Sequence, residues 1–70
     1  MNEKIMIEKT WTVNNKHFRD PLCITKSYLV SELTGKKIQN SVVYSVDEFE
    51  GDNLNCFATL KEAKEYAKNL

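Results

Sequence analysis

Polar and apolar positions alternate along residues 3–13. From Ile5 to Val13 every second position is apolar apart from Lys9, and most of the residues between are Thr, Glu or Lys. A period of two with β-branched and aromatic residues is typical of a half-buried β-strand. We therefore expect a strand over residues 3–13. The positions expected to face the core are Ile5, Ile7, Trp11 and Val13.

The same period continues in two further segments, residues 22–33 and residues 38–46. The four residues between them contain Gly35, which can adopt the positive φ that a tight turn needs. We therefore expect these segments to pair as a hairpin, with a short fourth strand over residues 54–57. The core-facing positions would be Leu22, Ile24, Tyr28, Val30, Ile38, Val42, Tyr44 and Val46.

The last part of the chain has the period of a helix rather than of a strand. Thr59 is followed three residues later by Glu62, which is the pattern of a capping box at a helix N-terminus. After Thr59, apolar residues recur at helical spacing and charged residues fill the other positions. The apolar stripe consists of Leu60, Ala63, Ala67 and Leu70. A helix this short is marginal by itself in water, so it must pack against the strands.

These elements predict an α+β fold: a three- to four-stranded antiparallel β-meander with one C-terminal α-helix on one face. We expect a single domain over residues 1–70. A chain of this length buries only roughly 60% of its unfolded surface, which favours a binding surface over a deep catalytic pocket. The lone His17 has no Ser or Cys nucleophile close to it in the sequence. We therefore expect no enzyme activity, no cofactor and no metal site.

The charges of the chain balance, with ten Lys and Arg against ten Asp and Glu. A neutral chain does not have the charge footprint of a protein that binds nucleic acid through charge alone. No apolar stretch is long enough to cross a membrane, so we expect a cytoplasmic protein without a membrane partner. The two cysteines, Cys23 and Cys56, are then expected to be reduced.

The sheet face opposite the helix is the candidate binding surface. Its positions are rich in hydroxyl groups and almost free of charge, as at the centre of a protein interface. The candidate interface residues are Thr10, Thr12, Thr25, Ser27, Leu29, Ser41 and Val43. The other explanation is that Thr is simply a good strand residue.

From this surface we expect a non-enzymatic protein-interaction module, such as a small accessory or regulatory protein of a bacterium or phage. It would bind a protein partner or form a homodimer, either through this face or by adding a strand at a sheet edge.

The alternative is a DNA-binding module that uses basic residues in the loops. The candidate residues are Lys16, His17, Arg19, Lys36 and Lys37. Strands followed by a helix with Phe57, Thr59, Glu62 and Ala63 at its start resemble the arm-type DNA-binding domain of tyrosine integrases. The resemblance implies a sheet face that carries Arg and Lys into the major groove. In this sequence that face carries hydroxyl groups, and the basic residues fall in loops that can simply be solvated.

Overall fold

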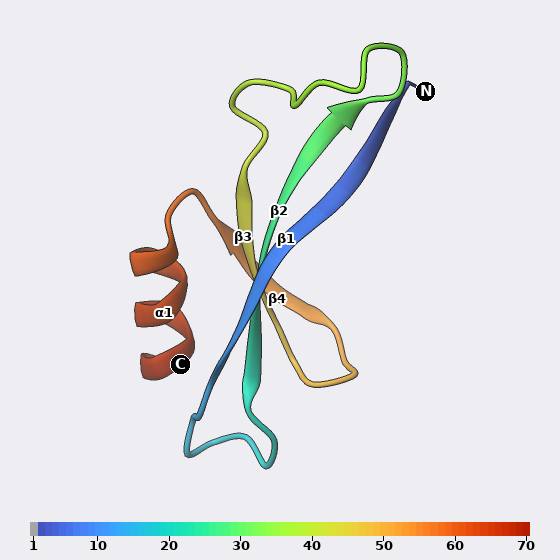
Figure 1. Cartoon of the computed structure of the whole chain (residues 1–70). Helices are drawn as coiled ribbons and strands as arrows, with labels where there is room; N and C mark the ends of the chain where they lie inside the picture. The colour runs from blue at the N-terminus through green and yellow to red at the C-terminus, as the bar shows by residue number, and fades with distance from the viewer. Residues whose placement is uncertain (1) are drawn as a thin grey trace.

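The computed structural model describes residues 2–70, which form four strands followed by one helix. The strands pair as one antiparallel sheet in the order β1-β2-β3-β4, and α1 packs on one side of it (Figure 1). The predicted α+β meander with a C-terminal helix is therefore confirmed. The elements are β1 (Glu3–Val13), β2 (Leu22–Ser31), β3 (Val43–Asp47), β4 (Asn53–Phe57) and α1 (Leu60–Asn69).

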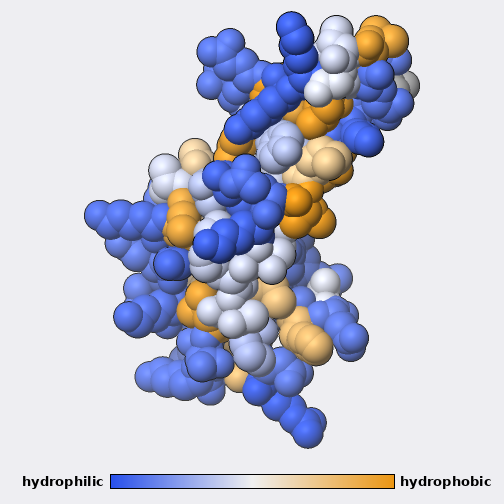
Figure 2. Space-filling view, in the orientation of Figure 1, coloured by the Kyte–Doolittle hydropathy of each residue, from blue (hydrophilic) through white to orange (hydrophobic). Residues whose placement is uncertain are grey.

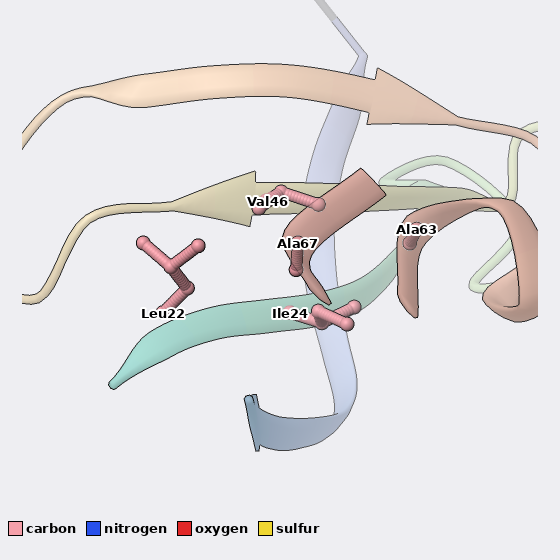
Figure 3. Close-up of a cluster of buried hydrophobic side chains, with 5 residues drawn as sticks. All are labelled: Leu22, Ile24, Val46, Ala63 and Ala67. Atoms are coloured by element: carbon pink, nitrogen blue, oxygen red, sulfur yellow. The ribbon is translucent and has the colours of Figure 1, made fainter. Parts of the chain in front are cut away.

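A small apolar core lies between α1 and the two central strands. Its fully buried members are Leu22 and Ile24 of β2, Val46 of β3, and Ala63 and Ala67 of α1 (Figure 3). The two alanines sit at the centre of the predicted helical stripe, where small side chains let the helix backbone approach the sheet closely. We refer below to the side of the sheet that α1 covers as the helix side, and to the other side as the open side.

The N-terminus of α1 is capped as the sequence predicts. Thr59 has an extended backbone, and its Oγ1 accepts a hydrogen bond from the Glu62 N–H at 3.2 Å. The same hydroxyl donates to Oε1 of Glu62 at 2.9 Å. Phe57, two residues before the cap, contacts Tyr66 with ring centroids 5.2 Å apart. The cap at Thr59 and the contact between the Phe57 and Tyr66 rings thus hold the end of β4 and α1 together.

β1 contains a bulge near its middle. Ile7 pairs with Ser27 and Lys9 pairs with Lys26, so Glu8 has no counterpart on β2. A bulge of this kind puts an extra residue in one strand and shifts the alternation of its side chains.

The bulge divides β1 into two halves with opposite apolar faces. In an antiparallel pair, directly opposed side chains lie on the same side of the sheet. Trp11 opposes the buried Ile24, so it lies on the helix side as predicted. Ile5 opposes Leu29 and Ile7 opposes Ser27, which places both isoleucines on the open side. The expectation that Ile5 and Ile7 face the core was wrong, because the isoleucines share one alternation with Trp11 and Val13 in the sequence, and that pattern does not reveal the extra residue.

β2 ends at Ser31, two residues earlier than predicted. The turn after it is built around Gly35, which has the expected positive φ of 70°. The Gly35 N–H donates to the Ser31 carbonyl at 2.8 Å, and the Ser31 N–H donates to the Lys36 carbonyl at 2.9 Å.

The third strand is shorter than residues 38–46, because β3 begins only at Val43. Asn40 has a φ of 61°, which interrupts an extended strand. The next residue, Ser41, accepts a hydrogen bond from the Leu29 N–H through its Oγ at 3.0 Å. A loop side chain thus satisfies a β2 backbone group that a continuous third strand would have bonded.

Candidate functional site

The helix covers only part of the sheet. An eleven-residue strand such as β1 is about 36 Å long, whereas a ten-residue helix is about 15 Å long. The molecule is accordingly elongated, with extents of 44 × 22 × 16 Å. Figure 1 shows the first half of β1 and the second half of β2 extending well beyond α1.

An apolar patch lies on the open side of this extension. It consists of Ile5 and Ile7 of β1, Leu29 of β2 and Val43 of β3, and we name it the open-side patch. Cross-strand pairs link its members, because Ile5 opposes Leu29, and Ser27 lies between Ile7 and Val43. Ile5 is 70% exposed, Ile7 66% and Val43 37%. Figure 2 shows apolar surface on this extension among hydrophilic side chains.

Six of the seven predicted interface residues share the open side with these isoleucines. Thr10 opposes Thr25, Thr12 opposes Cys23, and Ser27 opposes Val43. The strand positions of this side carry no Lys or Arg within the described part of the chain. The open side therefore has two halves. The half that lies on the reverse of the part covered by α1 is rich in hydroxyl groups, and the half beyond the helix is apolar.

Ser41, the seventh predicted residue, has a different environment. It lies in the β2–β3 loop, where its Oγ donates to the Ile38 carbonyl at 2.6 Å and accepts from the Leu29 N–H. Its hydroxyl is therefore already used within the chain.

β1 is an edge strand, and its outer backbone groups have no strand beside them. The Glu32 N–H donates to the Asn2 carbonyl at 2.7 Å, which marks this as a directly hydrogen-bonded pair. Such pairs alternate along an antiparallel ladder, so Lys4 and Met6 also turn their backbone groups towards β2. The N–H and C=O groups of Ile5 and Ile7 consequently point away from β2 to the free edge.

Contacts on the far side of β2 agree with this alternation. Leu29, opposite Ile5, donates its N–H to Ser41 and accepts at its carbonyl from the Ile38 N–H at 2.8 Å. Because both of these bonds point away from β1, neither the N–H nor the C=O of Leu29 can form a hydrogen bond with Ile5. The two exposed isoleucines of β1 thus have backbone N–H and C=O groups that face its free edge.

The basic loop residues do not form one surface. Lys16, His17 and Arg19 lie in the loop between β1 and β2, whereas Lys36 and Lys37 lie in the loop between β2 and β3. Figure 1 shows these two loops at opposite ends of the long axis of the molecule.

The helix side carries a second surface that the sequence did not reveal, made of lysines stacked on aromatic rings. Lys37 lies 4.9 Å from the Tyr28 ring centroid, and Lys26 lies 5.9 Å from that of Tyr44. Lys9 lies 5.2 Å from the ring centroid of Trp11 in the same way. Such cation–π contacts are each worth about 0.5–1 kcal/mol at exposed positions.

One carboxylate reduces the positive charge of this second surface. Glu8, the bulged residue, forms an ion pair with Lys26 at 2.7 Å. The hydrogen bond between them lowers the pKa of Glu8 below its ordinary value and raises the pKa of Lys26 above its own. Both groups therefore stay charged over the whole neutral range.

Within residues 2–70, no three His, Cys, Asp or Glu side chains lie close enough to share a metal ion. The two free cysteines differ in exposure, since Cys23 is half-buried and Cys56 is exposed. In the same residues no helix is long and apolar enough to cross a membrane.

Comparisons with protein-family models, with curated proteins and with solved structures each found no match to this chain. The fold and the open-side patch define the chain as a small four-stranded α+β domain with one uncovered sheet face.

Proposed function

We propose that this chain is a non-enzymatic protein-binding domain that uses the open-side patch and the free edge of β1. The observation that carries the proposal is the position of Ile5 and Ile7, which are exposed apolar side chains beside unpaired backbone groups. A partner strand laid along β1 would pair with these backbone groups and cover these side chains. This is the mode of recognition known as β-strand addition.

Burial of the apolar side chains of the open-side patch would drive the binding of a partner. Covering an exposed isoleucine stabilises a complex by roughly 1.5–3 kcal/mol before the cost of association is subtracted. Two such residues, with Leu29 and Val43 beside them, give the patch an apolar centre. The Thr and Ser residues nearer to α1 provide a rim whose hydroxyl groups can form hydrogen bonds.

A substitution in the centre of the patch tests the proposal. Leu29→Glu places a carboxylate among the isoleucines without touching the core on the helix side. Phe49→Glu is the matched control, because Phe49 is 50% exposed in the β3–β4 turn and receives the same charge. The measurement is affinity capture of proteins from cell extract, with circular dichroism to show that both variants remain folded.

We expect the wild type and Phe49→Glu to retain the same specific protein, either another protein or a native copy of this chain, and Leu29→Glu to lose at least tenfold of it. Retention of that protein by Leu29→Glu at the wild-type level would show that the open-side patch is not the binding surface. The four residues of the open-side patch carry no charge, so binding through the patch should also change little with salt, unlike binding to phosphates, whose affinity falls steeply.

Nucleic-acid binding is the second candidate function, and the lysine–aromatic pairs of the helix side favour it. Bases can stack on aromatic rings beside cations, as in proteins that bind single strands. The lysines here already cover the rings, however, and Glu8 offsets the charge of Lys26. Titration with a single-stranded oligonucleotide at two salt concentrations tests this candidate: salt-sensitive binding that Lys37→Ala and Lys9→Ala weaken would support it.

A further inference from the structure

We propose that a second copy of this chain occupies the free edge of β1, antiparallel to it and with Met6 on the two-fold axis. The two sheets would then continue as one sheet of eight strands. This inference rests on the proposed function, since it names the partner of the same edge. It follows from the order of residues 4–8 and from the directions of their backbone groups.

Residues 4–8 are complementary to themselves when two copies run in opposite directions. Their order is Lys, Ile, Met, Ile, Glu. With Met6 opposite Met6, Lys4 lies opposite Glu8 of the second copy, and Ile5 lies opposite Ile7. Each half of the symmetric contact therefore contains one ion pair and one pair of isoleucines. Opposite charges and apolar side chains in directly opposed positions stabilise an antiparallel ladder.

The backbone groups fit the same register. Ile5 and Ile7 turn their N–H and C=O groups to the free edge, as derived above from the hydrogen bond between Glu32 and Asn2. In the proposed register they form a directly hydrogen-bonded pair, which occurs twice because of the two-fold symmetry. A shift of the register by one residue would place outward groups opposite inward groups and lose these bonds.

The two faces of the joint sheet are also consistent. A two-fold axis perpendicular to the sheet keeps the open side of one copy continuous with that of the other. Ile5 and Ile7 of both copies then meet on the open side and join two patches into one. Lys4 opposes Val30 on the helix side, and the Glu8 carboxylate lies there too, bonded to Lys26. The proposed ion pairs therefore form on a single face.

The bulge defines where the pairing ends. Beyond Glu8, Lys9 lies on the helix side, whereas Glu3, which would oppose it, lies on the open side. The complementary segment is thus confined to residues 4–8 in each copy. A short contact of this kind suits a dimer that forms and separates with concentration.

A charge exchange between two variants tests both the occupant and the register. In Lys4→Glu chains, four carboxylates would meet across the axis, and in Glu8→Lys chains four ammonium groups would meet. We expect each variant alone to dimerise about tenfold more weakly than the wild type in analytical ultracentrifugation. An equimolar mixture of the two variants restores both ion pairs, so we expect dimers of mixed composition at close to wild-type affinity.

Lys61→Glu is the control for the change in net charge, because Lys61 lies on the exposed part of α1. It should leave the dimer unchanged. A wild-type chain that sediments as a monomer at millimolar concentration would overturn the proposal. So would a mixture of Lys4→Glu and Glu8→Lys that remains as weakly associated as its two components.

A crosslink tests the register independently of charge. Met6 pairs of the proposed dimer are not hydrogen-bonded, and such opposed residues have Cα atoms about 4.5 Å apart, within the range of a disulfide. In a background with Cys23→Ser and Cys56→Ser, Met6→Cys should form a disulfide-linked dimer under mild oxidation. Thr10→Cys, on the same strand but far from the axis, should not. Equal crosslinking of both variants would contradict the register.

Failure of this inference is distinguishable from failure of the proposed function. If the chain stays monomeric but Leu29→Glu still loses a captured protein, the patch binds a different partner and only the self-pairing is wrong. If neither dimer nor captured protein depends on the patch, the proposed function is wrong as well.

Discussion

Asn15 is the residue through which the β1–β2 loop holds the end of α1. It is 7% exposed, and its Nδ2 donates to the Ala67 carbonyl at 2.7 Å. Its Oδ1 accepts from the His17 N–H at 2.8 Å, which shapes the loop. The last carbonyls of a helix have no partner within the helix, so a side-chain donor there both satisfies them and positions the helix. The sequence alone does not indicate this contact, because Asn15 and Ala67 are more than fifty residues apart in the chain.

Replacing Asn15 by Ala should destabilise the domain by about 1–3 kcal/mol, because the buried Ala67 carbonyl loses its donor. Urea denaturation followed by tryptophan fluorescence measures the change. Asn14→Ala is the control, since Asn14 is the exposed neighbour in the same turn, and its substitution should cost well under 1 kcal/mol. Equal losses of stability in the two variants would show that the Asn15 contact does not anchor the helix.

Among the elements, α1 shows how far local sequence rules reach. The Thr59–Glu62 pattern and the apolar stripe predicted where the helix begins and which side of it packs, and both predictions are confirmed. These rules act within a few residues, so they are visible in the sequence alone. The cap satisfies an N–H that the helix cannot satisfy itself.

Thr59→Ala should therefore lower the free energy of unfolding by about 1 kcal/mol, with α1 fraying first. Thermal unfolding monitored by circular dichroism measures the loss. Thr59→Ser keeps the hydroxyl that accepts from Glu62 and should retain most of the stability. A serine variant as unstable as the alanine variant would mean that the hydroxyl is not what matters at this position.

The strands show where such rules stop. Apolar residues keep the same alternation on both sides of Lys9, so the extra residue at Glu8 could not be located from the sequence of β1 alone. With the bulge, the half of β1 near Trp11 turns its apolar side chains to the core on the helix side. The other half, which α1 does not cover, turns its isoleucines to the open side. A comparison of helix and strand lengths would have indicated that one half of β1 lies uncovered. The shortened β3 has a similar origin, since the turn at Asn40 and the Ser41 hydroxyl replace strand pairing next to Leu29.

On the scale of the whole molecule, the bulge links the fold to the proposed function. The side chains near Trp11 build the core with α1, and those near Ile5 are turned to the opposite side and left exposed. Most of the predicted interface residues lie on that same side, but the two isoleucines that give it an apolar centre were assigned to the core. A short helix on a long sheet thus divides the molecule into a core-forming half and a half that we propose binds a partner.

Residue-resolved amide hydrogen exchange at several protein concentrations tests this account most directly. The Met6 N–H points to β2 and should be protected at every concentration. The Ile5 and Ile7 N–H groups point to the free edge and should exchange rapidly in dilute protein and become protected as the concentration rises. Rapid exchange of Ile5 and Ile7 at all concentrations, or protection equal to that of Met6 in the most dilute sample, would contradict the account.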